Sequence, residues 1–217
     1  MFFDSNIIKR LFNWVDRCFG VDSYRYINEA GFRAGGSNSS GDERSFAALL
    51  EKAKSLIPAD GNVKLHLGCG KNHFEGYINI DLRQTSATDV ECDISKLPFD
   101  DASVQLIETY HVIEHLPRHD VPKALAEWRR VLIEGGQLII ECPDFDGAVK
   151  EYIEGNESRI DNIFGLQRFD GDTHLFGYNT KRLMELLAHA GFKEIKSCVP
   201  RDYHCDLEPC LRVEARK

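Results

Sequence analysis

The sequence predicts an α/β fold with a doubly wound, mostly parallel sheet, and three observations support this class. Strand-like and helix-like segments alternate from residue 43 to the end of the chain, as they do in βαβ units. The last two strand-like segments are joined without a helix, so we expect them to be antiparallel neighbours. The chain has 217 residues, of which 42% are hydrophobic, and this suffices for one domain core with an appendage.

The predicted strands are short apolar runs bounded by turn residues. In chain order they cover residues 63–67, 77–82, 90–93, 104–109, 137–142, 193–199 and 211–215. Because ligands of such sheets bind beyond the carboxyl ends of the strands, functional residues are expected directly after these runs.

The predicted helices carry apolar residues at helical spacing. They cover residues 43–57, 121–132 and 180–190, and a further helix is expected from residue 112. The segment at 121–132 is the clearest, since Val121, Leu125, Trp128 and Leu132 lie on one stripe. The pair Gly135-Gly136 and the single Gly191 end the last two of these helices.

Residues 1–40 differ from the rest of the chain. Ile8, Leu11, Phe12, Val15 and Phe19 recur at helical spacing, and residues 34–42 read as a flexible linker. We therefore predict an N-terminal helical extension with its linker at residues 1–40 and a main domain at 41–217. The mixed charges on the polar face of this helix favour docking on the main domain or on a second copy, as in a homodimer, over a membrane surface.

Composition restricts the classes of partner. With 27 Lys and Arg against 35 Asp and Glu, the formal net charge is −8, which argues against a nucleic-acid partner. No apolar run approaches the roughly 20 residues that a membrane span needs, and the first residues do not resemble a signal peptide. Seven cysteines, an odd number, predict reduced thiols and a cytoplasmic protein.

Residues suited to a nucleoside follow the first three predicted strands. Glycines after the first strand expose backbone amides, and a carboxylate after the second can accept hydrogen bonds from ribose hydroxyls. The predicted cofactor-binding residues here are Gly68, Cys69, Gly70, Asp81, Leu82, Asp93 and Ile94. Only residues 68–76 separate the first two strands, which is too short for a crossover helix, so a nucleoside without a pyrophosphate is favoured over NAD.

Several segments occur in the order of the motifs of one enzyme family. They cover residues 65–70, 76–81, 93–99, 111–116, 134–138 and 174–192. With these segments the chain resembles a class I S-adenosylmethionine-dependent methyltransferase of the Methyltransferase-11/23 type over roughly residues 43–217. The resemblance implies a Rossmann-like sheet of seven strands with an antiparallel last strand. It also implies S-adenosylmethionine as methyl donor and S-adenosylhomocysteine as product. His66 departs from the family, which has an acidic residue at that position of its first motif.

Two histidines are candidate catalytic residues. A hydroxyl acceptor must lose a proton, and histidine is the side chain best suited to take it near neutral pH. His111 follows the fourth strand, where it is also predicted to contact the cofactor, and His174 lies in the segment where the family forms its acceptor pocket. Further candidates for this pocket are Asp144, Phe145, Arg168 and Tyr178.

The predicted function is methyl transfer to a small-molecule or carbohydrate acceptor at oxygen, and the subgroup resemblance suggests sugar or polysaccharide biosynthesis. One alternative is a catalytically silent binding domain with this fold. Another is a metal-assisted methyltransferase that uses His111, Glu114 and His115, with His174 as a further ligand. No metal is assigned, because no ligand spacing is decisive. For the same reason the C-terminal set Cys198, His204, Cys205 and Cys210 is not predicted to bind zinc.

Overall fold

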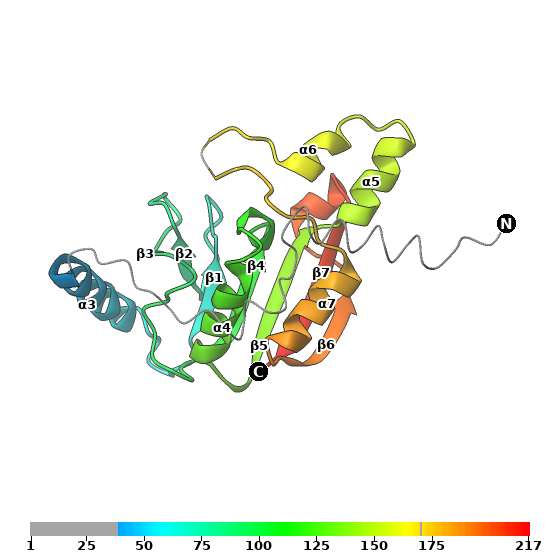
Figure 1. The fold of residues 1–217 in the computed structure, drawn as a ribbon. Coiled ribbons are helices and arrows are strands. Elements are labelled where there is room, and N and C mark those ends of the chain that lie inside the picture. Colours follow the sequence, from blue (N-terminus) through cyan, green and yellow to red (C-terminus); the bar gives the residue numbers. More distant parts are fainter. Residues whose placement is uncertain (1–38, 170) are drawn as a thin grey trace. The chain divides into compact units, whose positions relative to one another are not determined.

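Seven strands form one sheet in the order β3-β2-β1-β4-β5-β7-β6 in the computed structural model, which describes residues 39–169 and 171–217 (Figure 1). The strands are β1 (Lys64–Leu67), β2 (Ile78–Asp81), β3 (Val90–Glu91), β4 (Val104–Tyr110), β5 (Leu132–Pro143), β6 (Lys193–Cys198) and β7 (Cys210–Arg216). The pairs among β1 to β5 are parallel, whereas β7 is antiparallel to both β5 and β6. The predicted mostly parallel sheet with an antiparallel last strand is therefore confirmed.

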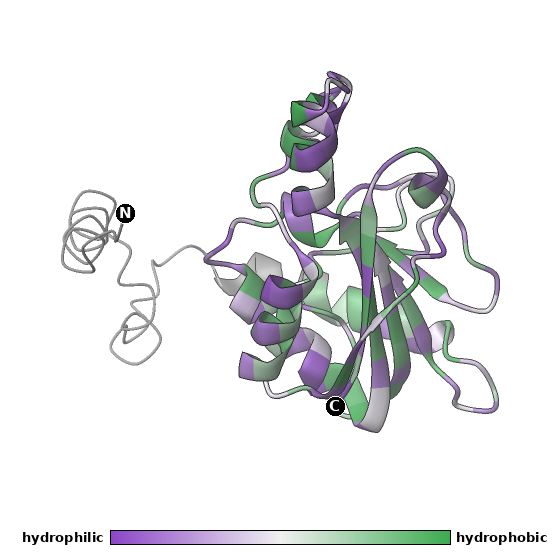
Figure 2. Ribbon diagram, turned by 90° about the vertical axis from the view of Figure 1, so that its right-hand side faces the viewer, coloured by the Kyte–Doolittle hydropathy of each residue, from purple (hydrophilic) through white to green (hydrophobic). Residues whose placement is uncertain are grey.

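Helices cover one face of this sheet (Figure 2). The longer ones are α3 (Ser39–Ser55), α4 (Val121–Val131) and α7 (Thr180–His189). They share one core with the apolar side chains of the strands, as Ala53, Trp128 and Leu187 are fully buried in the same cluster as Leu65 and Ile140. None of the described helices is long and apolar enough to cross a membrane.

The opposite face of the sheet is polar. Alternation along β1 buries Leu65 and Leu67 against the helices and turns His66 to the other side, where it pairs in register with Asn79 and Glu108. His66 is only 2% exposed, its Nδ1 lies 3.1 Å from Oδ1 of Asn79, and its ring stacks on Phe74 at 3.9 Å. Hydrogen bonds and ring contacts thus stabilise this face. Among the described residues no helix covers it (Figure 2).

The structure departs from the predicted elements at several points. The helix expected from residue 112 is the short 3-10 turn η1 (Ile113–His115), and α3 begins at Ser39, inside the expected linker. β5 begins at Leu132, five residues before the predicted start at residue 137, and runs through Gly135 and Gly136. Its register with β4 shifts between Val104 and Leu106, as at a β-bulge.

Three further elements were not predicted, namely α5 (Phe145–Ile153), α6 (Arg159–Phe164) and the 3-10 turn η2 (Tyr203–Asp206). The helix expected within the first 38 residues, and with it the homodimer, lies outside the described residues and stays a prediction.

The buried face of α4 supplies a test of the core. Trp128 is fully buried and its Nε1 donates a hydrogen bond to the carbonyl of Ile94 at 3.0 Å. We expect Trp128→Ala to lower the free energy of unfolding by about 3–5 kcal/mol, because it leaves a large cavity. Urea unfolding measures the loss. The matched control Lys123→Ala, at an exposed position of the same helix, should change stability by less than about 0.5 kcal/mol. Equal effects of the two substitutions would contradict this account of the core.

Candidate functional site

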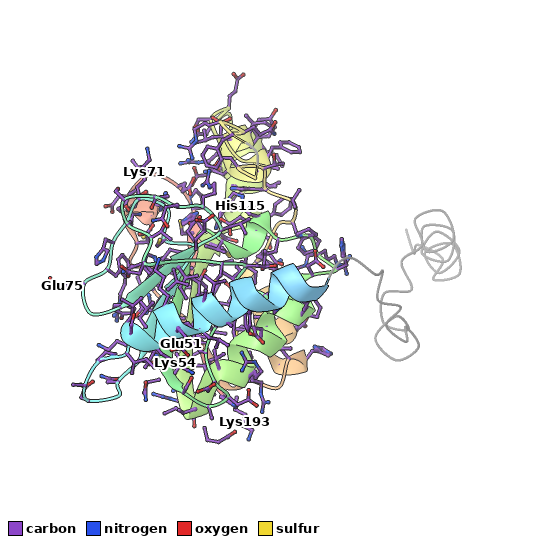
Figure 3. The ribbon with its side chains drawn as sticks, turned by 90° about the vertical axis from the view of Figure 1, so that its left-hand side faces the viewer. Glu51, Lys54, Lys71, Glu75, His115 and Lys193 are labelled. Carbon is purple, nitrogen blue, oxygen red and sulfur yellow. The ribbon has the colours of Figure 1, made fainter. Side chains whose placement is uncertain are left out.

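The candidate site lies at the carboxyl edge of the parallel strands, below α5 and α6 (Figure 1). Loops that follow β1, β2, β4 and β5 meet there, together with the segment that contains η2. Figure 3 places His115 toward α5 and α6, at the opposite end from Lys193, the first residue of β6. This is the edge at which ligands bind in open α/β sheets.

The turn after β1 depends on two glycines with left-handed backbones. Gly68 has a φ of +69°, and a Cβ at this position would lie 2.2 Å from Cγ2 of Val112. Gly70 has a φ of +53°, and nothing lies within 4 Å of the place where its Cβ would be. The turn therefore packs closely on the segment after β4 at one glycine and leaves open space at the other.

Asp81 connects this turn to the end of β2. Its Oδ2 accepts a hydrogen bond from the Gly70 amide at 2.8 Å, and its Oδ1 accepts one from the Arg83 amide at 3.0 Å. Each carboxylate oxygen can accept a further hydrogen bond. The neighbouring Leu82 is 69% exposed. The predicted ribose-binding residue and the glycine turn thus lie together, while their ligand stays a prediction.

The two predicted residues after β3 differ in accessibility. Asp93 is exposed, and its Oδ1 accepts a hydrogen bond from the amide of Ser95 at 2.8 Å. Ile94 is 8% exposed and belongs to the core cluster. Of this pair, the carboxylate is therefore the group more available to a ligand.

His111 is the first residue after β4 and adopts a left-handed backbone with a φ of +54°. Such conformations are rare outside glycine and gather at functional sites. Its Nδ1 lies 3.5 Å from an Oε1 atom of Glu114 and 3.5 Å from that of Glu208, and its Nε2 lies 4.0 Å from Oδ2 of Asp202. The ring also lies on that of His204, with 4.0 Å between their centroids.

Burial controls the charges around His111. Burial, together with the nearby His204, lowers the pKa of the His111 imidazole to about 3, so the ring is neutral at neutral pH. Burial also raises the pKa of Glu114 to about 8 and raises that of Glu208. The site therefore combines an uncharged imidazole with carboxyl groups that hold their protons more tightly than usual.

A second group of side chains surrounds Glu114. The rings of His115 and His174 lie nearly perpendicular, with 4.9 Å between their centroids. Nδ1 of His115 lies 3.1 Å from the carbonyl of Thr173, and Nδ1 of His174 lies 2.8 Å from that of Asn162. The structure thus brings both predicted catalytic histidines to one edge, each within reach of the same buried carboxylate.

The other pocket candidates divide into two groups. Phe145 and Tyr178 line a small cavity together with Glu114 and His174. Asp144 is half-buried at the start of α5, where burial raises its pKa. Arg168 is exposed and forms an ion pair with Asp172 at 2.8 Å, so it does not line that cavity.

Asp202 and Glu208 were not predicted from the sequence, because neither belongs to a recognisable motif. Both lie between β6 and β7 and reach the site through tertiary contact alone. The C-terminal cysteine and histidine residues do not gather as one zinc site. Within the described residues, His204 groups with His111 and Asp202, and Cys210 with His111 and Glu208, without Cys198 or Cys205.

Comparisons with known proteins agree with this fold. A family model described as a methyltransferase domain matches residues 48–140. An uncharacterised 37.1 kDa protein in a transposon of Streptomyces fradiae is 40% identical over 140 residues, which cover 54% of this chain. The chain spans 39% of the length of that relative.

Two solved structures share the fold. A SAM-dependent methyltransferase from Archaeoglobus fulgidus superposes with a TM-score of 0.53 at 15% identity, covering 89% of this chain and 100% of its own. One from Thermotoga maritima has a TM-score of 0.51 at 20% identity, covering 79% of this chain and 89% of its own.

The close approach at Gly68 can be tested against a glycine with the same backbone. Gly61 also has a φ of +69°, but nothing lies within 4 Å of its added Cβ. We expect Gly61→Ala to lower the free energy of unfolding by about 1–2 kcal/mol through backbone strain alone. Gly68→Ala should cost roughly 1–3 kcal/mol more, because the methyl group overlaps Val112. Urea unfolding of both variants measures the difference, and equal losses would show that the turn does not need this packing.

Proposed function

We propose the following activity, which is supported by the methyltransferase-domain model that matches residues 48–140 and by the strand order β3-β2-β1-β4-β5-β7-β6. The protein transfers the methyl group of S-adenosylmethionine to a hydroxyl oxygen of a small-molecule or carbohydrate acceptor. The main support is the joint position of the glycine turn, Asp81 and His111 at the carboxyl edge of β1, β2 and β4.

The residues at this edge fit an adenosine group. The open space at Gly70 admits a ligand beside backbone, and the Asp81 carboxylate has capacity left for the two ribose hydroxyls. Leu82 offers an exposed apolar surface next to that carboxylate, and Asp93 offers an acceptor for an amino group. The same edge is formed in part by the backbone of Gly68 and Cys69 in the turn after β1. The side chain of Ile94 supports it from the core. When bound, S-adenosylmethionine supplies an electrophilic methyl group on a sulfonium centre.

His66 does not take part in this proposal. In the first motif it stands where the family has an acidic residue, but it is buried on the polar face, stacked on Phe74 and bound to Asn79. Its ring therefore stabilises the turn between β1 and β2 from the polar face of the sheet. The amino end of the cofactor must be bound by other groups.

His111 is the base in the proposed mechanism. Its neutral ring can accept the proton that a hydroxyl loses as the oxygen attacks the methyl group. Asp202 and Glu208 lie within 4.0 Å of its ring nitrogens and stabilise the positive charge that the ring then carries. A hydroxyl acceptor is favoured because it requires such a base, whereas a neutral amine attacks with its own lone pair. The main contribution of the remaining residues is to hold acceptor and methyl group close and in line.

Exposed apolar side chains surround the same edge and favour an organic acceptor with some apolar surface. Phe169 is 43% exposed, Leu175 is 52% exposed and Tyr203 is 55% exposed. The Arg83 guanidinium lies 4.0 Å from the ring centroid of Phe169. Aromatic walls with a few polar groups are typical of small-molecule sites.

The ribose role of Asp81 gives a direct binding test. We expect Asp81→Ala to weaken the binding of S-adenosylhomocysteine by roughly 10- to 100-fold, since hydrogen bonds to a charged group contribute about 1.5–3 kcal/mol. Isothermal titration calorimetry measures the affinity. Asp101→Ala, at a carboxylate that is 80% exposed and far along the chain from the turn, serves as the control and should bind normally. An Asp81→Ala variant with unchanged affinity would refute the assignment.

The acceptor class can be tested with purified protein and two sets of compounds. We expect S-adenosylhomocysteine to form with hydroxyl acceptors, such as monosaccharides and nucleotide sugars, and not with matched amines. His111→Gln should lower kcat by roughly 10²- to 10⁴-fold, as expected for loss of a general base. Its affinity for S-adenosylhomocysteine should change much less, and His119→Gln, at an exposed histidine, should keep full activity. Turnover with amines alone, or full activity of His111→Gln, would overturn this mechanism.

A further inference from the structure

We propose that Glu114, His115 and His174 form a binding site for one divalent transition-metal ion, with Zn²⁺ as the ion to test first. A ring nitrogen of each histidine and a carboxylate oxygen of Glu114 all lie within 4.8 Å of one another. Nε2 of His115 lies 3.9 Å from Oε1 of Glu114. Zinc bonds of about 2.1 Å in tetrahedral geometry separate two ligand atoms by about 3.4 Å, so a closure of roughly 1 Å completes the site.

The state of Glu114 is the independent observation that points to a cation. Its side chain is 3% exposed, and neither of its two carboxylate oxygens has a hydrogen-bond partner. Buried polar groups in folded proteins are almost always partnered, because an unpaired one costs several kcal/mol. The nearest ring nitrogen of His111, at 3.5 Å, makes no hydrogen bond with it. A metal ion between Glu114 and the two histidines would satisfy this carboxylate.

The chain contains a second buried carboxylate that shows the contrast. Glu141 is fully buried, but it forms an ion pair with Arg212 and accepts hydrogen bonds from the backbone amides of Arg201 and Asp202. Its negative charge is therefore explained by protein groups. The carboxylate of Glu114 has no such set of donors, although it is buried almost as deeply.

The two histidines are oriented in the way that metal ligands usually are. A backbone carbonyl can only accept a hydrogen bond, so the Nδ1 atom that faces it must carry the hydrogen. This applies to His115, which faces the carbonyl of Thr173, and to His174, which faces that of Asn162. This leaves Nε2 of both rings with a free lone pair. Ligating histidines typically donate their other ring N–H to a carbonyl or carboxylate, which fixes the tautomer. The loop that carries His174 is itself bound to η1, since the amide of Leu175 donates to the carbonyl of Glu114 at 2.7 Å.

Two neutral imidazoles and one carboxylate favour a particular class of ion. Imidazole nitrogen suits Zn²⁺, Fe²⁺ and related ions, whereas Mg²⁺ and Ca²⁺ prefer oxygen ligands alone. Three protein ligands also leave a coordination position for water or another oxygen ligand. The small cavity beside Glu114 and His174, lined by Phe145 and Tyr178, provides room on that side.

The neighbouring group around His111 is the competing location. There the atoms already have partners, because Asp202 and His204 are hydrogen-bonded to each other. The unpartnered carboxylate therefore favours the Glu114 group.

The test is a zinc titration of the full chain after chelation and dialysis, followed by isothermal titration calorimetry without S-adenosylmethionine. We expect one Zn²⁺ per chain and a rise in Tm on binding. His174→Gln and His115→Gln should each weaken Zn²⁺ binding by at least tenfold, as should the isosteric variant Glu114→Gln. The matched controls His119→Gln and His204→Gln should bind Zn²⁺ as the unmodified protein does. Far-UV circular dichroism of the metal-free variants checks that each one is folded.

Three results would overturn the proposal. The first is the absence of Zn²⁺ binding to the unmodified chain, and the second is unchanged Zn²⁺ binding in folded Glu114→Gln. The third is loss of Zn²⁺ binding in His204→Gln alone, which would assign the ion to the His111 group. Because the readout is metal binding, it does not depend on methyl transfer. Failure of the proposed methyltransferase activity would leave the metal result unaffected.

Discussion

The buried carboxylate of Glu141 holds together the part of the structure on which the site depends. This side chain joins β5 to β7 through its ion pair with Arg212, and it accepts hydrogen bonds from the backbone amides of Arg201 and Asp202. The backbone carbonyl of Glu141 accepts a further hydrogen bond from the amide of His111. Burying such a charge is favourable only when its hydrogen bonds are satisfied, and here the donors come from two separate segments, β7 and the stretch that leads into η2. The last strands and the segment of η2 are therefore positioned together over the end of β4.

This arrangement explains why the chemistry gathers around His111. The segment that Glu141 holds also carries Asp202, and Glu208 follows in the same connection between β6 and β7. On the other side, the loop before α7 brings His174 to Glu114 and His115. One end of the sheet thus combines a position suited to a nucleoside, a neutral imidazole and a carboxylate without a partner, and these three features underlie the two proposals.

How well each element could be predicted depends on whether it is specified by neighbouring residues or by contacts with distant segments. Strands β1 to β7 were expected near their observed places, because buried strands require apolar runs and the glycines after them mark the turns. Helix α5 was not predicted, although Phe145, Ala148, Val149, Tyr152 and Ile153 recur at helical spacing, and only Ala148 of this helix is buried. Helix α6 has six residues, too few to show a period, and none of them is buried. The helix expected from residue 112 failed because Val112 and Ile113 pack at the end of β4 against Gly68 and the core, so only one 3-10 turn forms.

The sequence by itself determined the class of sheet, the glycine turn after the first strand, the carboxylate at the end of the second strand, and the resemblance that names the methyl donor. These features are local, since each depends on residues a few positions apart or on a repeated pattern of burial. Only the tertiary structure decided that Asp202 and Glu208 face His111, and that Glu114 lies buried without a hydrogen-bond partner between two histidines oriented by backbone carbonyls. Burial and orientation depend on which distant segments pack together, and spacing along the chain does not encode that packing.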